Sequence, residues 1–587
     1  MEDLNLSFDD MEFYKGTSFY VAGAWNKTTE YHNNSSRIDV VSHNGNSYMA
    51  LKNNTNVEPG TDATMWQIMA VAGDAGTIEV GTVETVAPGQ KATVTNVGTA
   101  HKAKLNFKIP KGEDGATEIT NLDELEKFIY YGVRRRVEQN SSSAWERIGA
   151  SVGKVANATK NGDSVTNDFD SIYPWSDIIT CNLDPSTNEI KAFMGDPTFD
   201  FTGQNGEVMT RIPLFYWKHY LKDGYEYILI SRHNLADFTK SDEFFIGRYI
   251  SSYDGTKLHS VTDKVPEVLR NISSFRAASR AVGENWCQLD YHYFLLQMLY
   301  LVEYADYNSQ SKLGNGLCTF RVTDNDKALL EEKNVNRIII ETARANAFVI
   351  GQQVSIGIKA AWNWSVAKNR TITKIEDYNS NNIVGKAIYF DGDPVNIDIG
   401  NNIWTTGQKS GQCDSLGMKS GCLSNDGKHA IIYRGIENIF ANVYQFVDGI
   451  NLKDYQAYVC TNPNEYVSDK FDEPYKKLGY MCFKPGEGAT GTSISGYGKQ
   501  LGFDNMNPLF SLPTEIGGSS NTYLCDYASI EKGNRIAFVG GSYSDGLTMG
   551  CSVGILTAVR VLALTISEVV FLNTRINGGM GAVSPQK

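Results

Sequence analysis

Short alternating runs of apolar and polar residues recur along the chain and predict a mostly β protein. Examples are RIDVV (37–41), SYMALK (47–52) and LNFKI (105–109). Gly, Asn, Ser and Pro separate these runs and indicate tight turns between short strands. We therefore expect many short strands, with an α+β arrangement in the long C-terminal part, where helices are few.

Two stretches follow the helical period instead. Residues 121–139 begin after Thr120, an N-cap residue type, and repeat apolar side chains at helical spacing, at Leu122, Leu125, Ile129, Val133 and Val137. Residues 289–310 are apolar almost all round, which predicts a buried helix. The first helix would be amphipathic and exposed, and the second would belong to a core.

Changes in these patterns divide the chain into four parts. Residues 1–72 are dense in Asn, Thr, Gly and aromatic residues and predict a small β-module. Residues 73–118 predict a short β-unit, and residues 119–143 a helical connector. Residues 144–587 predict one large domain of short strands, few helices and long Gly/Asn/Ser loops.

The short β-unit contains three predicted strands with turns at Pro88–Gly89 and Gly98. The strands are marked by three apolar sets: Val80, Val83 and Val86; Ala92, Val94 and Val97; Leu105, Phe107 and Ile109. Only the last set keeps the strict period of two that places side chains on one face of a strand.

Composition and charge exclude several classes of function. The 587 residues carry 54 Lys+Arg against 67 Asp+Glu, a net charge of −13, which argues against a nucleic-acid-binding body. The acidic start lacks the features of a secretory signal, and no apolar run reaches the roughly 18 residues of a membrane helix. We expect synthesis in a cytoplasm without membrane insertion.

The nine cysteines form no C-x-x-C and no pattern with histidine typical of zinc sites, so they are expected to be buried, reduced thiols. No metal and no cofactor is assigned.

Motifs for enzyme chemistry are weak. H-E-x-x-H and the P-loop motif are absent from the sequence, while GASVG (149–153) and GCSVG (550–554) match G-x-S-x-G. Neither Ser151 nor Ser552 follows a strand and precedes a helix, as a nucleophile elbow requires. GEGATG (486–491) opens no helix that could bind phosphate.

Carboxylate pairs are equally unspecific. Asp391 and Asp393, or Glu303 and Asp306, have the composition of a glycosidase pair, but such carboxylates are more often solvated turns or caps. The sequence therefore predicts a protein that is not an enzyme.

The N-terminal part contains Trp25, then a strand, HNGNSYMAL, a Gly/Pro loop and Trp66. It resembles the small carbohydrate-binding modules of chitinases and phage tail proteins, in which aromatic rings stack on sugars. The resemblance implies that Trp25, Tyr48 and Trp66 contact glycan. Tyr48 and Trp66 are the better candidates, because Trp25 begins the first predicted strand. The alternative is that the tryptophans form the core of a small domain.

The segment EVGTVETVAPGQKATVTNVGTAHKAKLNFKIPKGEDGA resembles a β-unit that recurs in phage tail fibres. In tail fibres such units lie along a trimer axis, so the resemblance implies a homotrimer. The Gly-x-y run KGEDGA is too short for a collagen helix by itself. The helix 121–139 would continue the axis, although Gly132 interrupts its apolar seam.

The long C-terminal part resembles C-type-lectin-like domains related to formylglycine-generating enzymes and to phage receptor-binding proteins. The matching stretches are EVMTRIPLFYWKHY (207–220), FLLQMLYLVEYADYNSQ (294–310), YRGIENIFANVYQFVDGIN (433–451) and FVGGSYSDG (538–546). Those enzymes use two closely spaced cysteines, whereas Cys525 and Cys551 are far apart here, so their activity is not expected.

These resemblances imply a phage virion tail protein, a tail fibre or receptor-binding protein, that adsorbs to the host. Its partners would be two copies of itself, other tail or baseplate proteins, and a host glycan or protein receptor. The phage resemblance implies a variable contact loop at Tyr543, Ser544, Asp545, Thr548 and Met549. The alternatives are a glycan-degrading tail enzyme and a purely structural baseplate or fibre component.

Overall fold

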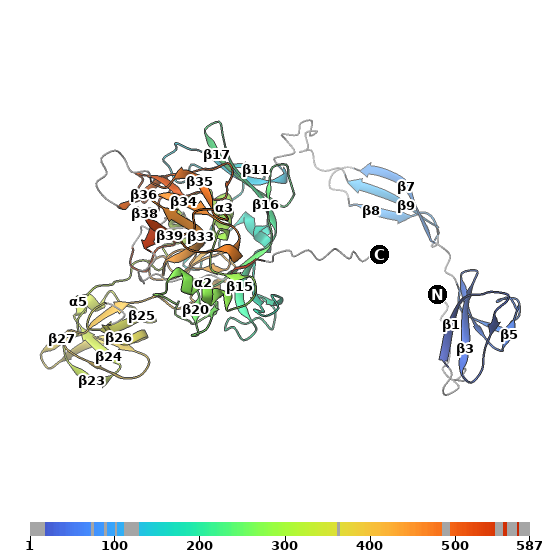
Figure 1. Cartoon of the computed structure of the whole chain (residues 1–587), viewed down its shortest axis with the longest axis horizontal. Helices are drawn as coiled ribbons and strands as arrows, with labels where there is room; N and C mark the ends of the chain where they lie inside the picture. The colour runs from blue at the N-terminus through green and yellow to red at the C-terminus, as the bar shows by residue number, and fades with distance from the viewer. Residues whose placement is uncertain are drawn as a thin grey trace. The chain divides into compact units, whose positions relative to one another are not determined.

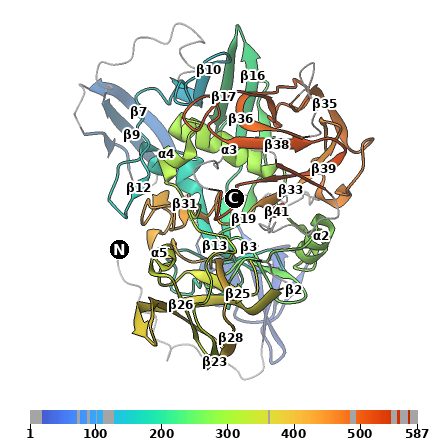
Figure 2. The ribbon, with the colours of Figure 1, turned by 90° about the vertical axis from the view of Figure 1, so that its left-hand side faces the viewer.

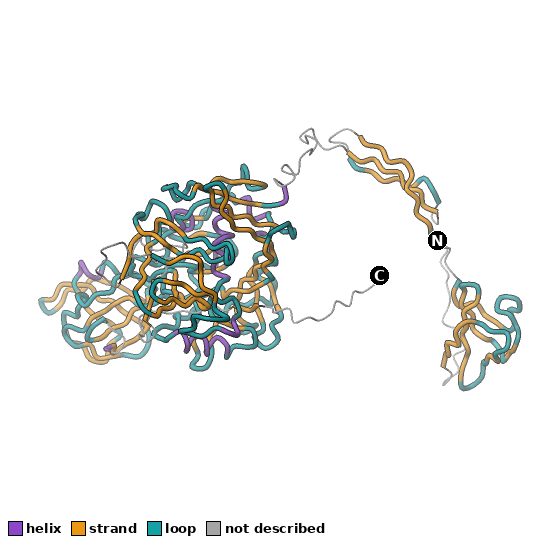
Figure 3. Tube along the Cα trace, turned by 45° about the horizontal axis from the view of Figure 1, so that its top comes forward, coloured by secondary structure: helices purple, strands orange, loops and turns teal. Residues whose placement is uncertain are grey.

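The computed structural model describes residues 18–71, 76–86, 91–99, 102–110, 128–360, 364–483, 493–545, 556–559 and 572–574. Strands greatly outnumber helices in these residues, which confirms the prediction of a mostly β protein (Figure 3). The chain divides into two compact units, Met1–Thr120 and Asn121–Lys587. Within the described ranges, no helix combines the length and the apolar character needed to traverse a bilayer.

A four-stranded sheet forms the N-terminal module. Its order is β1 (Ser18–Ala24), β3 (Arg37–His43), β4 (Asn46–Ala50) and β6 (Trp66–Ala70), beside a ladder of β2 (Glu30–Tyr31) with β5 (Asn54–Thr55). Asn44 and Gly45 both have positive φ and make the two-residue turn of the β3–β4 hairpin. One face of the sheet covers a small core of Tyr31, Val41, Tyr48, Ala50 and Trp66.

A separate three-stranded sheet, the connecting sheet, lies in the second half of the same unit. Its strands are β7 (Thr77–Val86), β9 (Lys102–Pro110) and β8 (Thr93–Asn96), in that spatial order. The three predicted strands are thus confirmed, while the predicted turn at Pro88–Gly89 lies outside the described residues. β7 runs parallel to β9, and β8 runs antiparallel to it.

A bulge in β7 explains why its valines do not keep a period of two. Val80 lies opposite Leu105 and Val83 lies opposite Phe107, so three steps in β7 match two steps in β9. The Asn106 side chain fills the bulge and accepts a hydrogen bond from the Thr82 amide at 2.8 Å. The bulge therefore returns the valines to the face that carries Leu105 and Phe107.

The two faces of the connecting sheet differ in chemistry. The register places one apolar set on a single face: Ile78, Val80, Val83, Val94, Leu105, Phe107 and Ile109. The opposite face carries charged partners, including Glu84 and Lys108, whose side chains lie 3.4 Å apart. On the apolar face Ile78 is 75% exposed, Val80 67% and Val94 59%. Leu105 and Phe107, in the central strand β9, are half-buried.

Apart from an inserted lobe, the C-terminal unit is built from three large sheets around a main core and a smaller second core. The first has the order β11 (Glu146–Gly149), β10 (Tyr131–Arg136), β17 (Tyr225–Ser231), β16 (Phe215–Lys222) and β18 (Thr239–Ser241). The second has the order β14 (Ile190–Phe193), β13 (Ile179–Leu183), β15 (Glu207–Ile212), β19 (Phe244–Gly247), β41 (Leu572–Thr574) and β22 (Trp286–Cys287). Smaller pairings join β12 (Thr159–Lys160) with β30 (Gly421–Cys422), β31 (Ile431–Tyr433) and β32 (Ile436–Glu437), and β20 (Ser252–Tyr253) with β21 (Leu258–His259).

The third sheet has eight strands among the described residues. Its order is β35 (Lys476–Met481), β34 (Gln456–Val459), β33 (Gln445–Lys453), β39 (Asn534–Val539), β40 (Leu556–Val559), β38 (Tyr527–Glu531), β36 (Ser493–Leu501) and β37 (Pro513–Ile516). The edge strands of this sheet are therefore β35 and β37.

The predicted buried helix is confirmed as α3 (His292–Tyr304), in which every residue is buried. It packs against β10 and β17 within the main core (Figure 2). The shorter helices α2 (Ile272–Arg280) and α4 (Ser309–Leu313) complete this part of the unit. A residue with positive φ, Ala305, ends α3.

An inserted lobe interrupts the C-terminal unit, a feature that the sequence analysis did not predict. Figure 1 shows it in yellow, with its strands gathered around their own core. Its elements are β23 (Glu332–Val335), β24 (Arg337–Ile340), α5 (Thr342–Ala345), β25 (Gln353–Gly357), β26 (Ser365–Ser380), β27 (Ile383–Phe390), β28 (Val395–Ile397) and β29 (Asn402–Thr405). The lobe core and the main core are separate clusters.

The helix predicted for residues 121–139 is wrong from Tyr131 onward, and among its described residues only Phe128 and Ile129 are helical. Tyr131–Arg136 form β10, paired with both β11 and β17 inside the C-terminal unit. Glycine is favoured at position 132 of this strand, because a Cβ added there would lie only 2.5 Å from the Leu229 side chain. Tertiary pairing outweighs the helical spacing, so these residues cannot continue a coiled-coil axis.

Candidate functional site

The three aromatic residues predicted to contact glycan do not form an exposed platform. Tyr48 is 8% exposed and Trp66 3%, so the expectation that these two rings are the exposed ones is wrong. Trp66 packs edge-on against Tyr31 and donates a hydrogen bond from Nε1 to the Val57 carbonyl at 2.8 Å. Trp25 follows β1 and is half-buried. A module this small uses its largest side chains for its core.

The predicted contact loop after β39 is also partly a structural element. Tyr543 is 5% exposed, and its amide donates to the Asn442 carbonyl at 2.8 Å. Asp545 accepts hydrogen bonds from the Ser542 amide at 2.8 Å and from the Tyr444 hydroxyl. Ser544 is exposed. Thr548 and Met549 lie outside the described residues.

Groups considered for enzyme chemistry have structural partners. Ser151 is fully buried, and its hydroxyl accepts a hydrogen bond from the Gly132 amide at 3.0 Å. Glu303 is fully buried and binds Arg434 through both carboxylate oxygens, at 2.9 and 2.6 Å. A buried carboxylate held in this way is shielded from substrate.

The cysteines in the described ranges show no activation as thiolates. All eight are buried thiols, and Cys551 lies outside the described residues. Burial raises the pKa of the Cys525 thiol to about 12, which keeps it neutral and weakly nucleophilic. Within the described ranges, no group of three His, Cys, Asp or Glu side chains has the geometry of a metal site.

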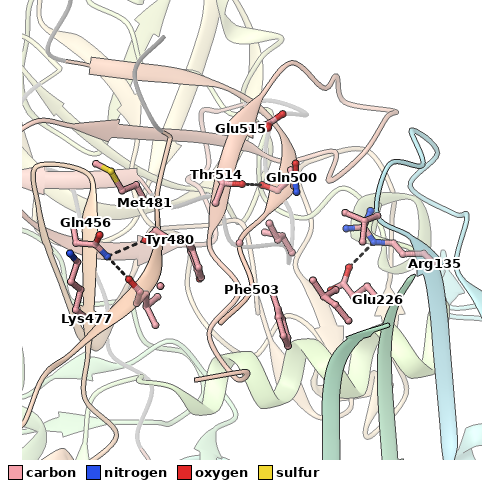
Figure 4. Close-up of a pocket in the computed structure, with 16 residues that line it drawn as sticks. Arg135, Glu226, Gln456, Lys477, Tyr480, Met481, Gln500, Phe503, Thr514 and Glu515 are labelled. Carbon is pink, nitrogen blue, oxygen red and sulfur yellow. Dashed lines mark hydrogen bonds and ion pairs between the residues drawn. The ribbon is translucent and has the colours of Figure 1, made fainter. Parts of the chain in front are cut away.

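The C-terminal unit contains a pocket of about 1220 Å³, here called the edge pocket. Both edge strands of the eight-stranded sheet line it, β35 with Lys477 and Met481 and β37 with Thr514 and Glu515. Strands β10 and β17 of the five-stranded sheet close the remaining side (Figure 4). The two edge strands, which stand at opposite ends of the strand order of the eight-stranded sheet, therefore meet at one pocket.

Tyr480 fixes the distance between the two edges. Its hydroxyl donates to the Phe510 carbonyl at 3.0 Å and accepts from the Leu512 amide at 3.1 Å, just before β37 begins. Gly502 passes so close that an added Cβ would lie 2.2 Å from the Tyr480 ring. Glycine is thus required at this approach, and the pocket wall is held by specific contacts.

An ion pair forms the inner wall of the edge pocket. Arg135 Nε donates to Glu226 Oε2 at 2.9 Å, and both side chains are buried. Burial alone would raise the pKa of the Glu226 carboxyl, but the Arg135 charge and the His219 hydrogen bond outweigh it and lower the pKa to about 2. Glu226 is therefore ionised in the folded protein near neutral pH.

His219 connects this wall to the loop that carries Phe503. Its Nε2 lies 3.0 Å from Glu226 Oε1 and its Nδ1 lies 2.7 Å from the Pro508 carbonyl. The two ring nitrogens thus face oxygen atoms from two different parts of the chain. The ring also packs edge-on against Phe503, with centroids 5.0 Å apart, and so positions that pocket residue.

The residues of the edge pocket follow from no pattern in the sequence. The helical spacing places Arg135 in a helix, although YYGVRRR also contains the aromatic and β-branched residues typical of a strand. Lys477, Gln500 and Phe503 belong to no motif. Only the three-dimensional path of the sheet brings them together, and no spacing along the chain could have shown this.

No protein-family model matches the chain, and no curated protein shows significant sequence similarity to it. The three motif resemblances therefore stay predictions. The connecting sheet and the edge pocket are the features whose geometry indicates function.

Proposed function

We propose that this chain is a virion tail protein, made in the host cytoplasm, that attaches a phage to the host cell surface as a homotrimer. It would bind without catalysing a reaction, alongside other tail or baseplate proteins. The observation that carries the proposal is the uncovered apolar face of the connecting sheet. This face supports self-association, and the tail-fibre resemblance of the same residues supports three copies.

The connecting sheet cannot bury its own apolar residues. Residues 76–110 fall below the roughly 40 residues that usually suffice for an independent core. Single exposed apolar residues are common, but a continuous apolar sheet face opposite a charged face is typical of an interface. The same face on another copy offers complementary apolar surface without unpaired charges, which favours cyclic association.

Association of copies would make weak binding strong. Each trimer would carry three N-terminal modules and three C-terminal units, so any receptor site is present three times. When one copy is bound, the others meet the surface at a high effective concentration, which increases avidity without new contacts. Host attachment through many weak contacts follows from this arrangement.

Adsorption of the intact, labelled protein to bacterial cells tests the proposal. We expect retention on a subset of strains, and loss of retention when surface glycan is removed from those strains. Release of oligosaccharide from the glycan would instead favour the glycan-degrading enzyme. Absence of retention on every strain would favour the purely structural component.

A further inference from the structure

We propose that the edge pocket binds an uncharged segment of a surface glycan. This inference rests on the proposed attachment function and names the part of the C-terminal unit that contacts the host. The pocket residues lie on strands and on anchored turns, which suits a preformed site.

The size and continuation of the edge pocket fit a chain rather than a small molecule. Its volume of about 1220 Å³ exceeds the roughly 300–1,000 Å³ typical of small-ligand sites. A second hollow of about 610 Å³ shares Val137, Gln500 and Glu515 with it. The two hollows therefore form one continuous surface that could hold several linked sugars.

The lining combines the two kinds of group that a sugar requires. Leu221, Met481 and Phe503 offer apolar surface for the C–H faces of a sugar ring. Gln500 offers an amide that can donate to and accept from hydroxyl groups. No hydrogen bond or ion pair ties the side chains of Gln500 and Lys477 to another residue of the described chain, so both are available to a ligand.

The charges of the pocket favour an uncharged ligand. Arg135 is paired with Glu226, and Lys499 with Glu515 at 3.2 Å. The lining of the edge pocket itself contains two cations and two anions, with Lys477 as the remaining cation. A ligand of high charge would have to break these pairs, whereas hydroxyl groups can be bound without doing so.

An extended peptide is the other polymer that sheet edges accept. Here the backbone groups of both edges are partly engaged. Pro513 in β37 has no amide hydrogen, and the Gly479 amide in β35 donates to Asp504 Oδ2 at 3.1 Å. Tyr480 further occupies the Phe510 carbonyl and the Leu512 amide. The structure therefore favours a glycan over a strand-forming peptide.

A binding experiment on the intact protein tests this assignment. The probes are a printed array of neutral and acidic bacterial surface polysaccharides, and a panel of extended synthetic peptides. We compare the wild type with the double variant Lys477→Ala/Gln500→Ala and with the control Lys532→Ala, an exposed lysine outside the pocket lining. The double variant should bind neutral polysaccharide at least about tenfold more weakly, and the control should bind like the wild type.

Loss of the Gln500 amide and the Lys477 ammonium group should leave the melting temperature and the oligomer mass unchanged, because neither side chain has a hydrogen-bond or ion-pair partner among the described residues. Equal binding of neutral polysaccharide by the double variant and the wild type overturns the inference. So does a wild type that binds only acidic polysaccharides, only peptides or nothing on the array. If intact protein still adsorbs to cells in those cases, the attachment function stands and its site lies elsewhere.

Discussion

The C-terminal unit and the connecting sheet contain similar apolar residues, but these residues have opposite surroundings. In the C-terminal unit the apolar side chains of three sheets and of α3 are buried in a main core and a smaller second one. In the connecting sheet the register also gathers apolar residues on one face, yet most of them are exposed. The pattern of residues is thus not sufficient to determine whether they are covered by their own chain.

The difference lies in what the chain can fold over each face. The C-terminal unit has several hundred residues, enough to return over its sheets from both sides. In the described residues the connecting sheet has three strands and no further element of its own. Under the proposed function identical copies cover its apolar face, because they are the partner that is always present at the same concentration.

The largest expected effect comes from a charge on the apolar face. Phe107→Asp places a carboxylate between Val83 and Val94, where association would bury it without a partner. Burial of an unpaired charge costs several kcal/mol for each copy, so the trimer should dissociate. Light scattering at micromolar concentration should return the 65.0 kDa mass of one chain.

Thr95→Asp is the matched control, because Thr95 lies opposite Asn106 on the other face of the same sheet. It should leave the mass at the wild-type value. Both variants should keep the melting temperature of the C-terminal unit. Equal masses for Phe107→Asp and the wild type would show that this face is not the interface.

In the N-terminal module, as in the C-terminal unit, we expect the large aromatic side chains to stabilise a core and not to bind glycan. Trp66→Ala removes the largest side chain of its core and should destabilise the module by about 3–5 kcal/mol. Hydrogen exchange over residues 18–71 of the intact chain would show the loss of protection. Trp25→Ala, at a half-buried position, should cost clearly less. Full protection in Trp66→Ala would restore the glycan-platform interpretation.

Acid should weaken the C-terminal unit through Glu226. The pKa of this carboxyl is lowered from 4.5 to about 2 in the folded protein, so the unfolded state binds more protons between these values. Its contribution is fully present above about pH 4.5 and is lost as the pH falls toward 2, roughly 3 kcal/mol in total. Denaturant unfolding at several pH values should show this loss, and Glu226→Gln should lack this component.

The smallest expected effect is the change in unfolding free energy of Gly132→Ala, whose sign distinguishes a strand from a helix at this position. In the observed β10, Gly132→Ala brings a Cβ within 2.5 Å of Leu229 and should destabilise the unit by about 1–3 kcal/mol. In the helix that the spacing predicts, the same change would stabilise by about 1 kcal/mol. The sign of the change in unfolding free energy, measured by denaturant titration, decides between the two.

The sequence predicted what depends on local pattern and missed what depends on distant pairing. The strands of the connecting sheet and the buried helix α3 follow from periodicity, and both are present. The residues 131–136 have helical spacing and strand-forming types together, and only the pairing with β17 resolves the conflict. The edge pocket depends on where two sheet edges meet, which no local signal encodes.

The aromatic residues illustrate the same limit. Trp25, Tyr48 and Trp66 match a binding-module pattern, but the pattern does not state which rings face solvent. The small size of the module makes burial the stronger demand, and Tyr48 and Trp66 accordingly lie in the core.

The mass of the intact wild-type chain in solution tests the central claim most directly. Light scattering at micromolar concentration should return three times the 65.0 kDa chain mass, because three apolar sheet faces are then covered. A mass of twice the 65.0 kDa chain mass would support the same interface, but in a dimer of two facing sheets instead of a trimer. A single-chain mass would contradict the account, since the connecting sheet would then be stable with its apolar face in water.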